Sequence, residues 1–207
     1  MTDPVIVDAG PALNFFSINK ERLLLDAIGR IAAPETVAGE IRRKALRDVR
    51  FRAAADVWTK LEQTAWLDVL SDAVTPELAS AVQRITRIPM AERLRQGKDL
   101  GEVMVLAHAA VQAETGRDVV VLIDDAGGAR LAAIEVARLQ RLRAQGRCVG
   151  TLGLMNSQIV LERGAGRRYL PDRKAMRRTY AQLRECDDGL VDITKTDLLS
   201  KRVWANA

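Results

Sequence analysis

The sequence predicts an α/β protein in which helices flank a short parallel sheet. Short apolar or β-branched segments alternate with helical patterns along most of the 207-residue chain, as in proteins built on a parallel sheet. The clearest segment, residues 119–123, is an uninterrupted Val-Val-Val-Leu-Ile run. Such a run is typical of a central strand that is buried on both faces.

Five strands are expected in chain order, each separated from the next by helical segments. The strands are predicted at residues 4–8, 30–34, 66–70, 119–123 and 147–150. The helical patterns fall within residues 14–28, 34–45, 51–66, 75–88, 103–107, 129–142 and 151–161. Two of the helices begin near Pro34 and Pro76, each followed by a glutamate, and both residue types are favourable in a first turn.

The composition excludes several classes of protein. The net charge of +5 suits a polyanion held through its phosphates, whereas an aromatic content of 4% argues against a base-stacking platform. The single histidine, His108, excludes mechanisms that need two. Cys148 and Cys186 lie far apart without a CxxC spacing, which argues against a zinc site or a disulfide framework. No membrane-length apolar run or secretory signal is visible, so a cytoplasmic protein without membrane contact is expected.

Carboxylates follow two of the predicted strands and lie early in two of the predicted helices. Asp8 follows the first strand, and Asp124 and Asp125 follow the fourth. Glu40 and Glu102 lie near helix starts. The carboxyl ends of parallel strands meet at one edge of a sheet, so these side chains can converge there. Clustered carboxylates repel one another unless a divalent cation neutralises them, and oxygen ligands favour Mg²⁺ or Mn²⁺.

Each acid also has an ordinary structural interpretation. Asp99 begins an Asp-Leu-Gly-Glu segment that fits a capping box, and capping is favoured for Asp99. Glu102 ends this segment and fits either the capping box or a metal ligand one turn into a helix that faces the sheet edge. Glu40 would be an exposed helix residue, and either Asp124 or Asp125 would cap the helix that follows. Asp8 is the hardest to explain without a partner, because it follows a buried apolar run.

Five segments, taken in order, resemble the sequence blocks of PIN-domain nucleases. They are Val-Ile-Val-Asp-Ala-Gly-Pro at 5–11, Ala-Pro-Glu-Thr-Val-Ala-Gly-Glu-Ile at 33–41, the segments at 100–109 and 121–130, and Gly-Thr-Leu-Gly-Leu at 150–154. The last is similar to a segment of bacterial relatives close to the VapC-type toxins of toxin–antitoxin pairs. Their order is more specific than any one block. The resemblance covers residues 4–164 and implies a PIN-like three-layer fold.

The resemblance also implies a metal-dependent endoribonuclease. By position, Asp8, Glu40, Glu102 and Asp125 match the four acids of the family that hold Mg²⁺ or Mn²⁺ and carry the catalysis, with Asp124 as the adjacent candidate for the fourth metal ligand. The substrate implied is RNA, and the partners implied are a cognate antitoxin and a second copy in a homodimer. The expected function is hydrolysis of RNA phosphodiester bonds by the toxin of a toxin–antitoxin pair.

The chain departs from the family pattern beside two of the acids. Ala9 and Gly10 follow Asp8 where many relatives carry a hydroxyl residue, and residues 126–128 intervene before Arg130 where basic residues often follow the fourth acid. These departures leave open a non-catalytic PIN-like scaffold that binds RNA or a protein partner. A metal-dependent hydrolase of small phosphate esters is a third hypothesis.

The predicted nuclease domain spans residues 1–164, and residues 165–207 form a basic C-terminal helical extension with Met176, Tyr180 and Leu183 on one face. Basic residues gather in three clusters along the whole chain. They are Arg42, Arg43, Lys44, Arg47 and Arg50; Arg138, Arg141, Arg143 and Arg147; and Arg167, Arg168, Arg173, Lys174, Arg177 and Arg178. Most such clusters are exposed helix faces, and the first is the candidate for contact with the RNA backbone.

Overall fold

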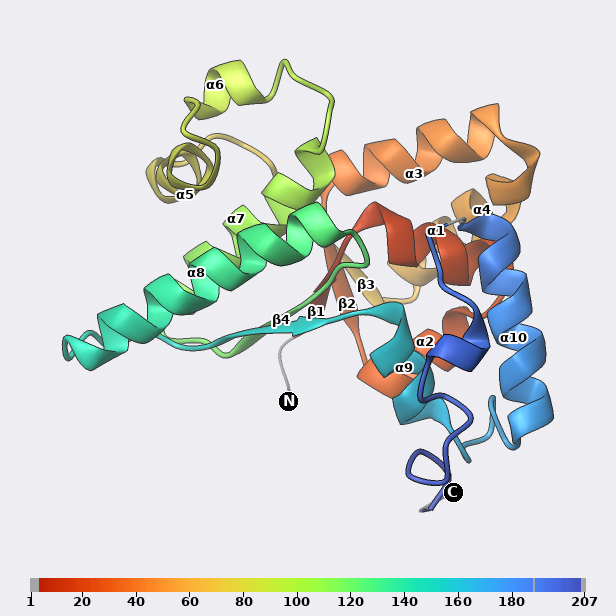
Figure 1. Ribbon diagram of the computed structural model, residues 1–207. Coiled ribbons are helices and arrows are strands. Elements are labelled where there is room, and N and C mark those ends of the chain that lie inside the picture. Colours follow the sequence, from red (N-terminus) through yellow and green to blue (C-terminus); the bar gives the residue numbers. More distant parts are fainter. Residues whose placement is uncertain (1–3, 188, 206–207) are drawn as a thin grey trace.

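The computed structural model describes residues 4–187 and 189–205 and confirms the predicted α/β fold (Figure 1). Five parallel strands form one sheet in the order β3-β2-β1-β4-β5, an order consistent with PIN-like folds. The strands are β1 (Val5–Val7), β2 (Ile31–Pro34), β3 (Leu67–Leu70), β4 (Val119–Leu122) and β5 (Leu152–Met155).

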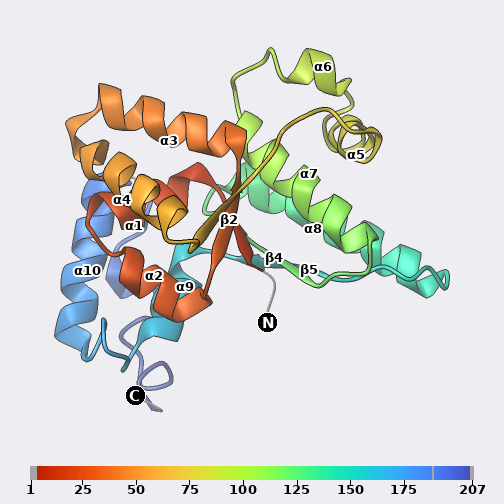
Figure 2. The same ribbon diagram turned by 180° about the vertical axis from the view of Figure 1, so that it is seen from behind.

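Helices flank the sheet on both sides. They are α1 (Ala9–Ser17), α2 (Glu21–Ile28), α3 (Glu35–Arg47), α4 (Arg52–Gln63), α5 (Pro76–Thr86), α6 (Met90–Arg93), α7 (Leu100–Glu114), α8 (Ala126–Ala144), α9 (Ser157–Gly164) and α10 (Arg173–Cys186). Figure 1 shows α7 and α8 on one side of the sheet and α1, α2 and α9 on the other. From behind, α3 and α4 lie side by side (Figure 2). None of the helices in the described residues is long and apolar enough to cross a bilayer.

The pairing of β1 with β4 sets the edge at which the predicted acids lie. Ile6 pairs with Val121 and Val7 pairs with Leu122. The backbone N–H of Asp8 then donates to the carbonyl oxygen of Leu122 at 3.0 Å. The two strands therefore end together, and the residues that follow them leave the sheet at the same edge.

The C-terminal residues pack on the core of the sheet domain. Met176, Tyr180 and Leu183 of α10 are buried in the main apolar cluster, which confirms the predicted apolar face of the extension. Asn14 Nδ2, on α1, donates to Asp187 Oδ2 at 2.8 Å. The helix α10 is therefore joined to α1 by both apolar and polar contacts.

A second, smaller apolar cluster lies where α5 and α6 pack on α7. Leu78 and Val82 of α5 and Met90 of α6 are buried in it together with Met104 of α7. Met104 lies two residues after Glu102, so this packing holds the first turns of α7, which carry Glu102.

Two expectations about the end of the sheet are wrong. The fifth strand is Leu152–Met155 rather than residues 147–150, and the helix expected over 151–161 begins only at Ser157. The strand β5 lies at the edge of the sheet, where a continuous β-branched run is not required, and Gly153 weakens its sequence signal. The short helix α6 is also absent from the sequence prediction.

Candidate acidic metal site

Asp8 is a buried carboxylate at the end of β1. It occupies the N-cap position of α1 and is only 7% exposed. Burial raises the pKa of Asp8 from its ordinary 3.8 to about 6; the backbone amides of Ala9 and Gly10 oppose this rise, and the charge of Glu40 adds to it. A buried carboxylate of this kind favours a proton or a cation as its partner.

Glu40 approaches Asp8 at the N-terminal end of α7. The point that a Cβ on Gly101 would occupy lies 3.2 Å from Glu40 Oε2 and 3.3 Å from Asp8 Oδ1. The same point lies 3.5 Å from Val37 Cγ2, so α3 and α7 pack closely here. Because Gly101 has no side chain, the carboxylates of Glu40 and Asp8 can both lie beside it.

Glu102 lies in the first turn of α7 and faces the first turn of α8. Its Oε2 is 3.2 Å from the point that a Cβ on Gly128 would occupy. Burial raises the pKa of Glu102 from its ordinary 4.5 to about 7, together with the negative charges of Asp8 and then Asp125. These contacts and charges define an acidic cluster that consists of Asp8, Glu40, Glu102 and Asp125.

The two aspartates after β4 face different partners. Asp125 is the N-cap of α8, and its Oδ2 accepts hydrogen bonds from two backbone N–H groups of the first turn. Asp124 accepts from the backbone N–H of Ser157 at 2.7 Å and from its hydroxyl at 2.6 Å. Burial raises the pKa of Asp124, and these hydrogen bonds oppose the rise. Asp124 therefore holds the start of α9, whereas the charge of Asp125 acts on Glu102.

Lys44 partly neutralises the acidic cluster. Its Nζ lies 3.2 Å from Glu40 Oε1, one turn further along α3. Its charge also acts on Asp8, where it lowers the pKa against the effect of burial. Arg42 of the same basic cluster instead pairs with Glu62 at 3.6 Å, so the basic residues of α3 face more than one direction.

Asp99 does not cap α7 through its side chain, contrary to the sequence prediction. It occupies the N-cap position with a left-handed backbone (φ 53°), and its carboxylate makes no capping hydrogen bond. An N-cap aspartate usually has an extended backbone, which lets the carboxylate reach the amides of the first turn. The charge of Asp99 instead contributes to the raised pKa of Glu102, after burial and the charges of Asp8 and Asp125.

Two glycines beside the acids were not marked by the sequence analysis. Gly101 leaves room for Asp8 and Glu40, and Gly128 leaves room for Glu102. A Cβ on Gly128 would also lie 2.8 Å from Ile123 Cγ2. A signal was available, because glycine within a helix costs about 1 kcal/mol relative to alanine and therefore points to a steric reason.

The donors of the acidic cluster fit a hard divalent cation in their chemistry. All are carboxylates, the ligands that Mg²⁺ and Mn²⁺ prefer, and Asp8 is buried beside like charges. As they stand, the described residues include no group of three or more Asp, Glu, His or Cys side chains placed to hold one ion. Binding of a cation would therefore require side chains of the cluster to move. Glu40 Oε2 faces Asp8, whereas Glu40 Oε1 contacts Lys44.

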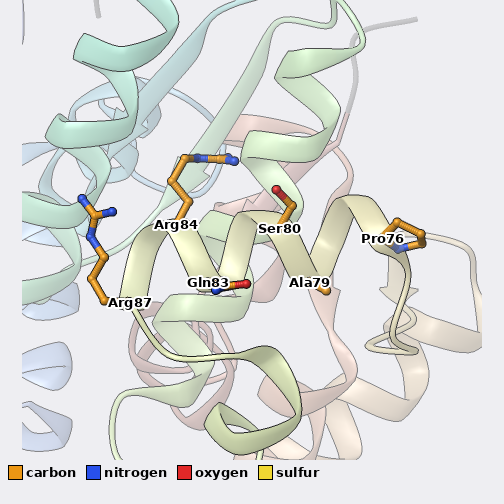
Figure 3. Close-up of a pocket in the computed structure, with 6 residues that line it drawn as sticks. All are labelled: Pro76, Ala79, Ser80, Gln83, Arg84 and Arg87. Carbon is orange, nitrogen blue, oxygen red and sulfur yellow. The ribbon is translucent and has the colours of Figure 1, made fainter.

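A hollow on α5 lies apart from the acidic cluster (Figure 3). It is lined by Pro76, Ala79, Ser80, Gln83, Arg84 and Arg87, and this lining shares no residue with the cluster. Arg84 pairs with Glu114 of α7 at 2.9 Å and with Glu135 of α8 at 3.4 Å. The guanidinium group of Arg84 thus has a structural role between three helices.

No protein-family model, no curated protein and no solved structure matches the chain. Fold and site therefore define its class: an α/β protein with a parallel sheet in the order 3-2-1-4-5 and an acidic cluster at the carboxyl edge of that sheet. This topology is consistent with PIN-like folds. The activity is a proposal that begins from the acidic cluster.

Proposed function

We propose that the protein is a Mg²⁺- or Mn²⁺-dependent endoribonuclease that hydrolyses RNA phosphodiester bonds. The observation that carries this proposal is the convergence of the acidic cluster at the carboxyl edge of a PIN-like sheet, where the pKa values of both Asp8 and Glu102 are raised. Such a group of anions is costly to the fold unless a cation neutralises it. The sequence blocks that resemble PIN-domain nucleases contain all members of the cluster.

The acidic residues would bind the cation, and Lys44 would contact the substrate. Asp8, Glu40, Glu102 and Asp125 would hold the cation, with Asp8 fixed by its burial at the N-cap of α1. When bound, Mg²⁺ or Mn²⁺ supplies a Lewis acid for water activation and for stabilising charge on the phosphate. Movement of Glu40 away from Lys44 would free the ammonium group of Lys44 to contact a phosphate oxygen of the substrate.

The biological role that we propose is that of a toxin with a cognate antitoxin. It rests on the resemblance of residues 150–154 to bacterial relatives of the VapC-type toxins, and these residues include the first three of β5. The same resemblance supports a homodimer. Size-exclusion chromatography with light scattering measures the mass of the purified chain, and a single-chain mass at all concentrations would contradict the dimer.

The central test is the cleavage of a labelled RNA of mixed sequence. The wild-type protein is expected to cut it with Mg²⁺ or Mn²⁺ and not with chelator, and Asp8→Asn is expected to lower the rate at least a hundredfold. The matched control is Asp56→Asn, the same chemical change at an exposed position on α4. Equal, metal-independent cleavage by the wild type and Asp8→Asn, in a preparation in which Asp56→Asn behaves the same, would contradict the proposal, because the cleavage would not depend on the acidic cluster.

A second candidate function is a PIN-like scaffold without catalysis. It is favoured by the ion pair between Lys44 and Glu40 and by the lack of three ligands in place among the described residues. The scaffold predicts binding of RNA by the wild type without Mn²⁺ binding and without cleavage. Turnover of p-nitrophenyl phosphate without RNA cleavage would instead support the hydrolase of small phosphate esters.

Asp124→Asn is expected to separate the two aspartates after β4. Asparagine keeps an acceptor for the backbone N–H of Ser157, offers an N–H₂ group that can donate to the hydroxyl oxygen, and removes a buried charge, so the free energy of unfolding is expected to change by less than about 1 kcal/mol. Affinity for Mn²⁺, measured by calorimetric titration, is expected to stay within about threefold, whereas Asp125→Asn weakens it by tenfold or more. A tenfold loss in Asp124→Asn would identify Asp124 as a ligand.

A further inference from the structure

Three polar side chains form a partly buried network beside the acidic cluster. Asp72, which follows β3, accepts hydrogen bonds at Oδ2 from the backbone N–H of Thr36 at 2.7 Å and from its hydroxyl at 2.5 Å. Its Oδ1 lies 2.9 Å from Nε2 of His108 on α7. The side chain of Asp72 is 9% exposed and that of His108 is 13% exposed. The network therefore joins α3, α7 and the segment after β3.

The segment after β3 is held to α3 from both directions. Glu35 Oε2, in the first residue of α3, accepts from the backbone N–H of Asp72 at 2.8 Å. Burial alone would raise the pKa of Asp72, but the hydrogen bonds from His108 and Thr36 outweigh it and lower the pKa. Asp72 is therefore a fixed anion at neutral pH, with each carboxylate oxygen engaged.

The network and the acidic cluster lie on the same pair of helix faces. Thr36 precedes Glu40 by four residues on α3, and residues at this spacing share a face of a helix. His108 follows Gly101 by seven residues on α7, which again places the two on one face. Because Gly101 is the point where α7 meets Glu40 and Asp8, α3 and α7 are joined at two places about 10 Å apart along α7.

We propose that Thr36, Asp72 and His108 act as a positioning clamp that holds α7 against α3 and so keeps Glu102 within reach of Glu40 and Asp8. This inference rests on the proposed function for its catalytic consequence. The clamp makes no contact with cation or RNA. It acts by fixing the relative positions of the helices that carry the acids, and its loss leaves every member of the acidic cluster in the chain.

If the clamp is correct, the position of α7 depends on a hydrogen-bond donor at residue 108 and not on the imidazole ring itself. His108→Leu removes the donor to Asp72, whereas His108→Gln offers an amide N–H₂ at a similar distance from the helix. The matched control is Tyr180→Phe, which removes a hydrogen bond of 2.8 Å to the carbonyl of Val191, away from α3 and α7. Each of the three variants changes one polar group that lies in a packed environment.

Two measurements on these variants, made well below each thermal midpoint, test the clamp. Hydrogen–deuterium exchange of the metal-free protein is expected to rise at least tenfold for amides in residues 36–42 and 100–106 in His108→Leu. It is expected to stay near the wild-type rate there in His108→Gln and Tyr180→Phe. Calorimetric titration with Mn²⁺ is expected to give at least tenfold weaker affinity for His108→Leu, with recovery to within about threefold in His108→Gln.

The outcomes separate the clamp from the proposed function. Unchanged exchange at both segments in His108→Leu overturns the clamp, whatever the metal does. Faster exchange in His108→Leu together with wild-type Mn²⁺ affinity would show that the network stabilises the helices without positioning the acids. This result also overturns the clamp. Absence of Mn²⁺ binding by the wild type contradicts the proposed function, while the exchange data still decide whether the network holds α7 to α3.

Discussion

At pH 8 and without divalent cations, Asp8→Asn is expected to be more stable than the wild-type protein by up to about 3 kcal/mol. Burial raises the pKa of Asp8 from 3.8 to about 6, and this shift corresponds to about 3 kcal/mol of cost for the ionised carboxylate in the folded chain. Asparagine has a similar shape and no charge. The residue proposed to be central to catalysis is therefore expected to be a burden on the metal-free fold.

The pH dependence of this difference has a defined sign. A carboxyl group whose pKa is higher in the folded than in the unfolded chain stabilises the fold below its unfolded pKa and loses that contribution as the pH rises through the folded pKa. The advantage of Asp8→Asn is therefore small below pH 4 and grows between about pH 4 and pH 6. Glu102 extends this window to about pH 7, because burial and the charge of Asp8 raise its pKa to that value.

Urea unfolding of both proteins from pH 4 to pH 8, with and without Mg²⁺, measures the effect. Mg²⁺ is expected to stabilise the wild type at pH 8, to have little effect at pH 5, and to leave Asp8→Asn unchanged. Asp56→Asn, on the exposed face of α4, serves as the control and should follow the wild type. If Asp8→Asn is less stable than the wild type by the same amount at pH 4 and at pH 8, the ionised carboxylate of Asp8 does not destabilise the folded protein.

The second large effect is expected from Gly101→Ala. In most helical positions alanine is more stabilising than glycine by about 1 kcal/mol. Here the new Cβ would lie 3.2 Å from Glu40 Oε2 and 3.3 Å from Asp8 Oδ1, so both carboxylates must move apart. The two carboxylates need to give by only a few tenths of an ångström, and a misplacement of about 1 Å at a catalytic site can lower the rate about a hundredfold. We therefore expect about a tenfold loss in RNA cleavage with little loss of stability.

Gly39→Ala is the matched control for Gly101→Ala. Gly39 also lies within a helix, but a Cβ there would meet only the mobile end of the Arg43 side chain, at 3.2 Å. This variant is expected to keep its cleavage rate within about threefold and to gain a few tenths of a kcal/mol in stability. Equal cleavage by both alanine variants would mean that the acids do not need the space beside Gly101.

The central strands were predictable from the sequence because burial on both faces leaves a clear pattern. The apolar runs at β1 and β4 follow directly from helices that cover both sides of the sheet. The edge strand β5 lacks this signal, since its Leu-Gly-Leu-Met sequence is equally compatible with a helix. Its position is fixed by its pairing with β4 rather than by local preference.

The candidate site was predictable to the level of strand ends but not of side-chain direction. Carboxylates after β1 and β4 had to meet at one edge, and Asp8 and Asp125 do so. Adjacent residues project differently, so the sequence could not tell that Asp124 would turn to Ser157. The failure of Asp99 as a cap depends on a left-handed backbone, which aspartate adopts only occasionally.

The link between Asp72 and His108 lay beyond sequence reasoning for another reason. His108 stands in an apolar helix, and its side chain is largely buried there. Its partner comes from the end of a different strand, 36 positions away. Only the packing of α7 against α3 brings the two together.

The pairing of β1 with β4 has a consequence for how the protein folds. It joins the first strand of the chain to one more than a hundred positions later, and such distant pairings form slowly. A slip of one residue in this pairing would shift Asp8 by about 3.3 Å and turn its strand over. The acidic cluster therefore forms only when β1 and β4 pair in the native register. Uptake of a divalent cation during refolding is then expected to follow this pairing rather than the formation of the individual helices.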